Sequence, residues 1–396
     1  MKLGILREEK KPLDSRVPLT PDQCVFLMNK FPEIKIFVRS SGHRCFSDND
    51  YKKLGLEVVE ELDHCDVLLG IKEVPVESLI RNKTYLFFSH TIKGQEYNRK
   101  LLKSLIINNI RMIDYEVLKN NRGSRIIGFG RYAGVVGAYN CFLTHGLKNK
   151  LYNLKPAYKC RDRVEMESEL KKICLKNERI IITGKGRVSG GIIEIINKLG
   201  IKEVSKDEFI TEKFDVPVFT NLDFMDYYMR IDGLKSTKKD FLKNPNHYKS
   251  IFMNFAANAD ILITGHYYDS NAPYIFTRDD AKSKNFSLKV ISDISCDING
   301  PIATTIRSST IYRPIYGYNP ITEKEDDFMK HKVIAVMAVD NLPCELPLDA
   351  SFDFGNELVK NVIPLLIQDN NLIINNATIC KNGKLNDNYL YLENLI

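Results

Sequence analysis

The chain has 396 residues, of which 44% are hydrophobic and 27% charged, the composition of an ordinary globular protein. A single hydrophobic core stops growing at roughly 250–300 residues, so two domains are expected. The net charge of +7 comes from lysines scattered along the chain without a block of like charges, which argues against a nucleic-acid partner.

The cysteines and the apolar segments indicate the cellular compartment in which the protein is expected. The nine cysteines show neither a CxxC pair nor a metal-ligand spacing, so we expect free thiols, no metal site and a reducing cytoplasm. The N-terminus has no long apolar segment, and no apolar run approaches the roughly 18 residues of a membrane span. These features predict a cytoplasmic protein without a membrane partner.

The first third of the chain alternates strands and helices. A helix is expected from Thr20, with this residue as N-cap and Pro21 in the first helical position. The alternation is the βαβ pattern of a parallel sheet. The strands expected in this region are Lys2–Leu6, Ile34–Val38, Val67–Ile71, Tyr85–Phe88 and Ile110–Ile113.

Polar side chains follow two of these strands directly. They are Lys72, Glu73, His90, Lys93 and Gln95. Because parallel strands end at the same edge of a sheet, these groups should lie together where α/β sheets bind ligands. Arg16, after the first strand, can share this edge, and its guanidinium suits a carboxylate. Such a cationic site can bind carboxylates and move protons near neutral pH, although each residue alone could be a solvated loop residue.

Two further segments follow. Residues 123–138 carry Gly and Ala at spacings of three and four and continue as a helix, which predicts a close backbone contact in a helix running between domains. Lys148–Glu178 is rich in lysine and polar residues and is interpreted as a solvated connection to the second domain.

A glycine turn between a strand and a helix predicts a dinucleotide site. Arg179–Thr183 is the strand, Gly184, Gly186 and Arg187 lie in the turn, and an apolar helix follows. Glycines let the backbone approach a pyrophosphate, which the helix N-terminus attracts. An acid about 20 residues on should hold the ribose. Glu203, Asp207 and Glu208 compete for that role, and Asp207 is favoured.

The remainder predicts further strands of this half and a helical tail. Strands are expected at Asp260–Thr264, Leu288–Ile291 and Val333–Val339, with polar ends that point to a cofactor cleft. His266 either touches the nicotinamide ribose or is simply packed or solvated. Residues 221–250 are interpreted as an insertion of unassigned purpose. The tail from Leu346 to Ile396 is expected to be helical and to return to the first domain.

Several motifs resemble one superfamily. They are LREEKKPLDSRVPLTP, LLGIKEVP, FSHTIKGQ, GSRIIGFGRYAGVVGA, the glycine turn, DISCDINGPI and VDNLPCELP. On these motifs the chain resembles the alanine dehydrogenase and transhydrogenase superfamily, and within it the lysine-forming saccharopine dehydrogenases. Arg16, Lys72 and His90 have counterparts in both branches, so they indicate only the superfamily. Lys93-x-Gln95 and the stretch that begins at Phe129 favour the saccharopine dehydrogenase branch.

The resemblance implies an α/β fold of two Rossmann-like, doubly wound parallel-sheet domains with an active-site cleft between them. Residues 1–140 plus 344–396 would form the substrate domain, and residues 141–343 the NAD-binding domain. The cofactor implied is NAD, with NADP not excluded. The partner expected is a small amino-acid substrate, and the oligomeric state stays open.

The implied reaction converts saccharopine, NAD and water to L-lysine, 2-oxoglutarate and NADH, or the reverse. By position, Lys72 resembles the base for the amine proton and His90 the acid–base group for the water steps, with Glu73 and Glu116 tuning the pair. Residues matching substrate contacts are Arg16, Lys93, Gln95, Arg125 and Phe129. Residues matching cofactor contacts are Gly186, Arg187, Val339, Asp340, Asn341 and Leu342. The alternatives are an alanine or other amino-acid dehydrogenase, and a non-catalytic dinucleotide sensor.

Overall fold

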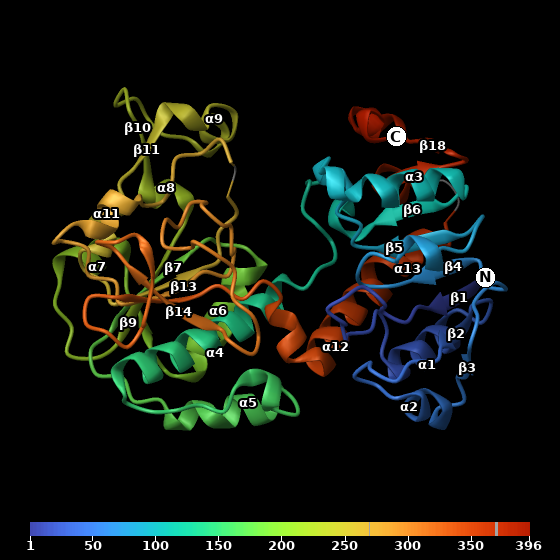
Figure 1. The fold of residues 1–396 in the computed structure, drawn as a ribbon, viewed down its shortest axis with the longest axis horizontal. Helices are drawn as coiled ribbons and strands as arrows, with labels where there is room; N and C mark the ends of the chain where they lie inside the picture. The colour runs from blue at the N-terminus through green and yellow to red at the C-terminus, as the bar shows by residue number, and fades with distance from the viewer. Residues whose placement is uncertain (269, 369–370) are drawn as a thin grey trace. The chain divides into compact units, whose positions relative to one another are not determined.

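The computed structural model describes residues 1–268, 270–368 and 371–396. These residues form two compact units, the first from Met1–Phe129 with Pro347–Ile396 and the second from Gly130–Leu346. Each unit, in its described part, contains an eight-stranded, mostly parallel sheet (Figure 1). The predicted α/β class with two Rossmann-like sheets is therefore confirmed. The function assigned to each domain stays a prediction.

The first unit has helices on both faces of its sheet. Its strand order is β18-β17-β6-β5-β4-β1-β2-β3. Side chains alternate between the faces: Leu69 and Leu86 pack with α1 and α12, whereas Leu68 and Phe87 pack with α3. The elements are β1 Lys2–Ile5, α1 Pro21–Lys30, β2 Lys35–Arg39, α2 Asp48–Lys53, β3 Glu57–Val59, β4 Val67–Leu69, β5 Thr84–Phe87, α3 Arg99–Ile107, β6 Arg111–Asp114, α12 Pro347–Glu357, α13 Ile363–Leu366, α14 Leu372–Ala377, β17 Thr378–Lys381 and β18 Lys384–Leu385.

The second unit has the strand order β15-β14-β16-β13-β12-β7-β9-β8. Strands β7, β9, β12, β13 and β16 run parallel, so their carboxyl ends share one edge. The elements are α4 Gly130–Asn149, α5 Arg163–Glu169, β7 Arg179–Thr183, α6 Arg187–Lys198, β8 Lys202–Glu203, α7 Lys206–Thr211, β9 Val218–Leu222, α8 Phe224–Tyr227, β10 Tyr228–Arg230, α9 Lys238–Lys243, β11 Tyr248–Ser250, α10 Met253–Ala256, β12 Ile261–Thr264, α11 Arg278–Lys282, β13 Val290–Ser292, β14 Ile315–Asn319, β15 Lys324–Asp326 and β16 Ile334–Met337.

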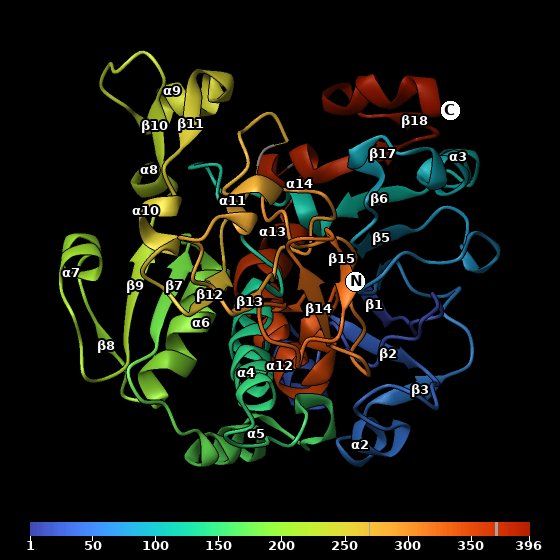
Figure 2. The same cartoon turned by 60° about the vertical axis from the view of Figure 1, so that its left-hand side comes forward.

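All the strands expected from the sequence are present, with ends shifted by a residue or two. The expected helix start is also present, because Thr20 caps α1 and its side chain accepts from the Gln23 amide in a capping box. The insertion at residues 221–250 includes an antiparallel ribbon, β10 with β11, which projects together with α9 from the rest of the second unit (Figures 1 and 2).

Two interpretations need correction. The tail, of which residues 369 and 370 lie outside the described part, is helical in its α-helices up to Ala377 and again in a 3-10 helical segment at Asp387–Leu395. Between these helices β17 pairs antiparallel with β6, and β18 with β17. Between them, Asn382 and Gly383 adopt positive φ angles of 54° and 71°, the geometry of a tight hairpin turn. Residues 148–178 lie within the second unit rather than leading to it, since this unit already begins at Gly130.

Helices α4 and α6 cross at two glycines, as the Gly and Ala spacing predicted, but both helices belong to the second unit. A Cβ on Gly134 would overlap the Val188 carbonyl oxygen, and one on Gly191 would overlap the Arg131 carbonyl oxygen. Both obstacles are backbone atoms, which cannot rotate away as a side chain can. Only glycine at these positions allows the helices to approach so closely (Figure 1).

Within the described residues, none of the helices combines the length and the apolar character that crossing a membrane requires.

Neighbouring glycines of α6 provide a matched test of this crossing. Gly191→Ala should lower the free energy of unfolding by about 1–3 kcal/mol, because the added methyl overpacks a rigid contact. Gly190→Ala, where an added Cβ meets nothing within 4 Å, should instead raise it by about 0.5–1 kcal/mol through the lower chain entropy of alanine. Urea unfolding followed by circular dichroism measures both; equal effects would contradict the packing described.

Candidate active site

The Glu73 carboxylate joins two cationic side chains at the edge of the first sheet. Its Oε1 lies 2.6 Å from His90 Nδ1, and its Oε2 pairs with the Lys10 ammonium. Glu73 follows β4 and His90 follows β5, and these strands are parallel neighbours. The expectation that both side chains emerge at one edge is therefore confirmed. Glu73 is only 9% exposed, so this carboxylate is well shielded from water.

His90 is held in a geometry that suits proton transfer. With Glu73 accepting from Nδ1–H, the lone pair of the imidazole is placed on Nε2, which makes no hydrogen bond within the described part of the chain. Its backbone has φ of 55°, an uncommon left-handed conformation for a residue other than glycine. Burial and the nearby Lys93 lower the pKa of His90. The neutral, proton-accepting form is thereby favoured.

Lys72 is positioned through a buried glutamate that the sequence analysis did not single out. Glu8 accepts from the amides of Ile71 at 2.6 Å and Lys72 at 2.8 Å, which fixes the backbone where β4 ends. Burial raises the pKa of Glu8 to about 7. Lys72 is half-buried, its charge influences the pKa of both Lys10 and Asp14, and its ammonium forms no ion pair with the described residues. This ammonium is thus available to a ligand.

Arg16 forms a buried ion pair with Asp14, and the charge of Lys72 also acts on this carboxylate. Its guanidinium donates from Nε to Asp14 Oδ1 at 3.0 Å and from Nη2 to Asp14 Oδ2 at 2.6 Å, and only 4% of its side chain is exposed. Although burial opposes it, this pairing holds the pKa of Asp14 well below its usual range. Arg16 also stacks over the Phe129 ring, 4.1 Å from its centroid. The arginine is therefore rigidly placed.

A second group of carboxylates lies where β6 ends. Asp114 accepts from the amides of Ser89 at 3.1 Å and Glu116 at 2.8 Å, and burial raises its pKa to about 6. Arg125 Nη2 lies 3.5 Å from Glu116 Oε1. The charges of Glu116 and Asp114 both reach His90, so the predicted tuning residue Glu116 belongs to the same cluster.

The structure brings most of the predicted substrate and catalytic residues of the first unit together. Lys93 is exposed but close enough to His90 to lower its pKa. Gln95 is exposed, and no contact of its side chain links it to the cluster within the described residues. The residues that sequence reasoning missed are Glu8, Lys10, Asp14 and Asp114. The first three lie in the charged loop after β1, where the sequence offers many charges and no signal for which fold inward.

The glycine turn of the second unit fits a dinucleotide. Gly184 has φ of 90°, and a Cβ there would overlap the Gly265 carbonyl oxygen, so the ends of β7 and β12 meet closely. Gly186 caps α6 without a side-chain acceptor, and a Cβ at this position would point into open space. The first amides of this helix, which begins at Arg187, therefore lack a side-chain cap and are open to a pyrophosphate.

The predicted ribose acid lies away from this turn. Asp207 is exposed in the first turn of α7, after the edge strand β8, and β9 separates β8 from β7. The turn instead contacts the end of β9: the side chain of Lys185, within the turn, donates from Nζ to the backbone carbonyl of Asn221 at 2.6 Å. The nearby Asp223 accepts from the Phe224 amide at 2.8 Å as the cap of α8.

Two other predicted cofactor positions lie along the same edge. Val339 and Leu342 are buried and Asp340 is exposed after β16, with Asn341 between them half-buried. At the end of β12, His266 Nδ1 lies 2.7 Å from the Thr183 hydroxyl, and burial lowers its pKa to about 4. His266 is therefore a neutral, packed side chain. Among the described residues, no group of three or more His, Cys, Asp or Glu side chains is arranged to hold a metal ion.

Known proteins are similar to this chain in sequence and in fold. Residues 4–136 match the family model of the alanine dehydrogenase/PNT N-terminal domain. The mitochondrial alpha-aminoadipic semialdehyde synthase of Rattus norvegicus is 30% identical over 99% of this chain and 48% of its own length, so the chain spans about half of that relative. The saccharopine dehydrogenase [NAD(+), L-lysine-forming] of Schizosaccharomyces pombe is 26% identical over 92% of this chain and 93% of its own. An L-alanine dehydrogenase structure covers both chains fully, with a TM-score of 0.65 at 15% identity.

The fold of this chain is thus similar to that of an L-alanine dehydrogenase, and its sequence is similar to those of enzymes named as NAD(+)-dependent saccharopine dehydrogenases. The predicted resemblance to saccharopine dehydrogenases is confirmed, and the match of residues 4–136 agrees with the predicted resemblance to the alanine dehydrogenase and transhydrogenase superfamily.

Lys93 provides a test of the electrostatics around His90. Lys93→Met removes a positive charge that disfavours protonation of the imidazole, so the pKa of His90 should rise and more of it should be protonated at a given pH. The titration is followed by NMR of histidine-labelled protein, with His90→Gln used to assign the signal. Lys100→Met, an exposed lysine on α3, is the control and should leave the titration unchanged. An unmoved or lowered pKa in Lys93→Met would contradict the arrangement.

Proposed function

We propose that this chain is a saccharopine-type dehydrogenase, which interconverts saccharopine and L-lysine plus 2-oxoglutarate with a nicotinamide dinucleotide. The observation that carries the proposal is the arrangement around Glu73, which orients His90 and pairs with Lys10. The charge of Lys72, whose ammonium forms no ion pair with the described residues, acts on Lys10 in the same cationic cluster. The similarity of this chain, over 92% of its length, to a saccharopine dehydrogenase supports the same reaction.

The chemistry needs two proton carriers of different kinds. Hydride leaves the carbon next to nitrogen only when that nitrogen is neutral, so the substrate ammonium must first lose a proton. Lys72, as the neutral amine, is the residue proposed to accept it and becomes an ammonium in doing so. Water must then add to the resulting iminium, and the Nε2 lone pair of His90 can take the proton that this water releases. The dinucleotide supplies the hydride acceptor when bound.

The cationic edge fits a substrate with several carboxylates. Saccharopine carries three carboxylate groups, and Arg16, Lys93 and Arg125 are the cations proposed to receive them. Phe129 fixes the Arg16 guanidinium by stacking, at 4.1 Å between the guanidinium carbon and the ring centroid. A small amino acid such as alanine has a single carboxylate and would engage fewer of these cations. This charge match favours saccharopine over the substrate of an alanine dehydrogenase.

Activity measurements on variants test the proposal. The purified chain should reduce NAD or NADP with saccharopine, and Lys72→Met and His90→Gln should each lower kcat by about 10²–10⁴-fold, the usual contribution of a general acid or base. Lys100→Met and His64→Gln, both exposed, are the matched controls and should retain wild-type turnover.

The remaining outcomes each point to a different function. Turnover of L-alanine but not of saccharopine would move the chain to the alanine dehydrogenase branch. Cofactor binding without turnover of either substrate would support a dinucleotide sensor instead and overturn the proposed reaction.

The choice between NAD and NADP depends on the end of β9. The resemblance implied NAD, with NADP not excluded, and Asp207 was the favoured ribose acid. Asp207 lies on α7 after the edge strand β8, which β9 separates from β7, whereas Lys185 belongs to the glycine turn itself. We propose that this cation favours the additional phosphate of NADP. NADPH should therefore bind at least as tightly as NADH, and Lys185→Met should weaken NADPH while leaving NADH unchanged. Fluorescence titration with each cofactor measures this, and a preference for NADH that Lys185→Met does not alter would contradict it.

A further inference from the structure

A polar pocket lies in the first unit, at the edge where β5 and β6 begin. Its volume is about 440 Å³, within the range of small-molecule sites. The strands that start here end at the candidate active site, because β5 leads to His90 and β6 to Glu116. The pocket and the active-site cluster are therefore at opposite edges of the same sheet. The residues that line it are Asn82, Lys83, Thr84, Asn109, Arg111, Leu366, Gln368, Asn371, Ile374, Asn375, Lys381 and Asn382.

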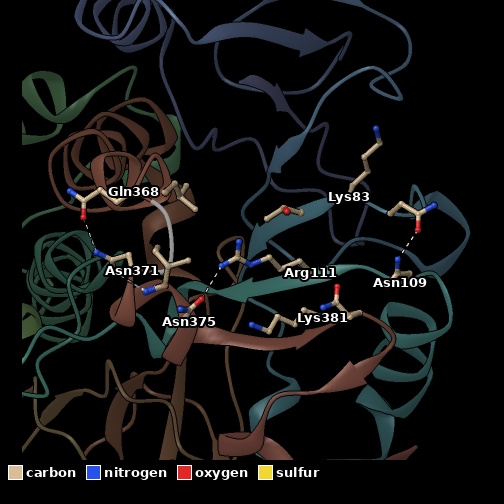
Figure 3. A pocket seen from close by; sticks show the side chains of 12 residues that line it. Lys83, Asn109, Arg111, Gln368, Asn371, Asn375 and Lys381 are labelled. Atoms are coloured by element: carbon tan, nitrogen blue, oxygen red, sulfur yellow. Dashed lines mark hydrogen bonds between the residues drawn. The ribbon is translucent and has the colours of Figure 1, made fainter.

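The described residues that line this pocket carry three positive charges and no negative charge. Lys83, Arg111 and Lys381 come from neighbouring strands or their ends, and the described lining residues contain amides and hydroxyls but no carboxylate (Figure 3). Like charges on adjacent strands repel one another, and adjacent strands lie only about 5 Å apart. An arrangement of this kind is costly unless an anion compensates it.

The side chains also leave hydrogen-bonding capacity unused. Arg111 Nε is buried and has no partner among the described residues, and Nη2 reaches Asn375 Oδ1 only at 3.4 Å (Figure 3). Burial lowers the pKa of Arg111, because it disfavours the charged form. The Lys381 side chain makes no hydrogen bond or ion pair within the described part of the chain, whereas Lys83 already donates to the Asp63 carbonyl. Arg111 and Lys381 are thus the two cations with capacity for a ligand.

We propose that this pocket binds a small phosphate-bearing molecule, with its phosphate between Arg111 and Lys381 and its polar body along the surrounding amides. A phosphate carries about −1.5 to −2 charges at neutral pH and three acceptor oxygens, which match two cations, whereas a single carboxylate would leave one cation uncompensated. The pocket is far larger than a bare phosphate ion. The amides of Asn82, Gln368 and Asn371 suit the hydroxyl groups of such a molecule. Binding at this pocket does not depend on the proposed function.

Calorimetric titration of the intact chain with glucose 6-phosphate, inorganic phosphate and malonate tests the proposal. Glucose 6-phosphate should bind more tightly than inorganic phosphate, and both more tightly than the dicarboxylate malonate. Arg111→Gln and Lys381→Gln should each weaken glucose 6-phosphate at least tenfold. Lys384→Gln, on the adjacent strand but outside the pocket, is the control and should leave the affinity unchanged.

Two further measurements distinguish binding in this pocket from binding at the glycine turn and from a loss of folding. Arg187→Met, at the glycine turn of the second unit, should leave glucose 6-phosphate binding intact. Because Lys381 is exposed and faces like charge, Lys381→Gln without ligand should melt at or above the wild-type temperature. The proposal is overturned by unchanged affinity in both pocket variants, by loss of binding in Arg187→Met, or by tighter binding of malonate than of the phosphates.

Discussion

The Glu73 carboxylate is the contact on which the candidate active site depends. It is nearly buried and has two oxygens; one accepts from His90 and the other pairs with Lys10. This arrangement selects the imidazole tautomer and keeps a second positive charge beside it. Burying the Glu73 carboxylate with only one of these partners would cost free energy, because one of its oxygens would lack a hydrogen bond. Both cations therefore contribute to keeping Glu73 in its position. Proton transfer at His90 is therefore linked to the charges of the loop after β1.

Strand geometry supplies the rest of the site. Glu8 bonds to two consecutive amides at the end of β4, so the backbone of Lys72 is fixed while its ammonium remains unpaired among the described residues. In the second unit, the close backbone contact at Gly184 brings the ends of β7 and β12 together at the glycine turn, and the contact at Gly191 lets α6 pack closely against α4. Buried polar contacts hold the proposed proton-carrying residues in place. At the glycine turn, Gly184 and Gly186 have no side chains that would block the approach of a ligand. Both arrangements are rigid before any ligand binds, which lowers the cost of orienting it.

Much of this could be predicted from the sequence because it depends on local patterns. Continuous apolar runs ending in polar residues identified β4 and β5, and that alone placed Lys72, Glu73 and His90 at one edge. The partners of these residues could not be predicted, since Glu8, Lys10 and Asp14 lie in a loop whose path depends on tertiary packing. Asp207 was chosen by distance along the chain, but strand order, which has no local signal, puts β9 beside β7. The hairpin at Asn382-Gly383 did have a local signal that the helical interpretation of the tail overlooked.

The central claim, that these residues support hydride transfer at a carbon joined to a secondary amine, is tested most directly by isotope transfer. The chain is incubated with L-lysine, 2-oxoglutarate and NADH or NADPH deuterated at the transferring carbon, and the product is analysed by mass spectrometry. The account predicts saccharopine with one deuterium on the carbon that was the keto carbon of 2-oxoglutarate. Cofactor oxidation without deuterated saccharopine, or no reaction with either cofactor, would contradict it.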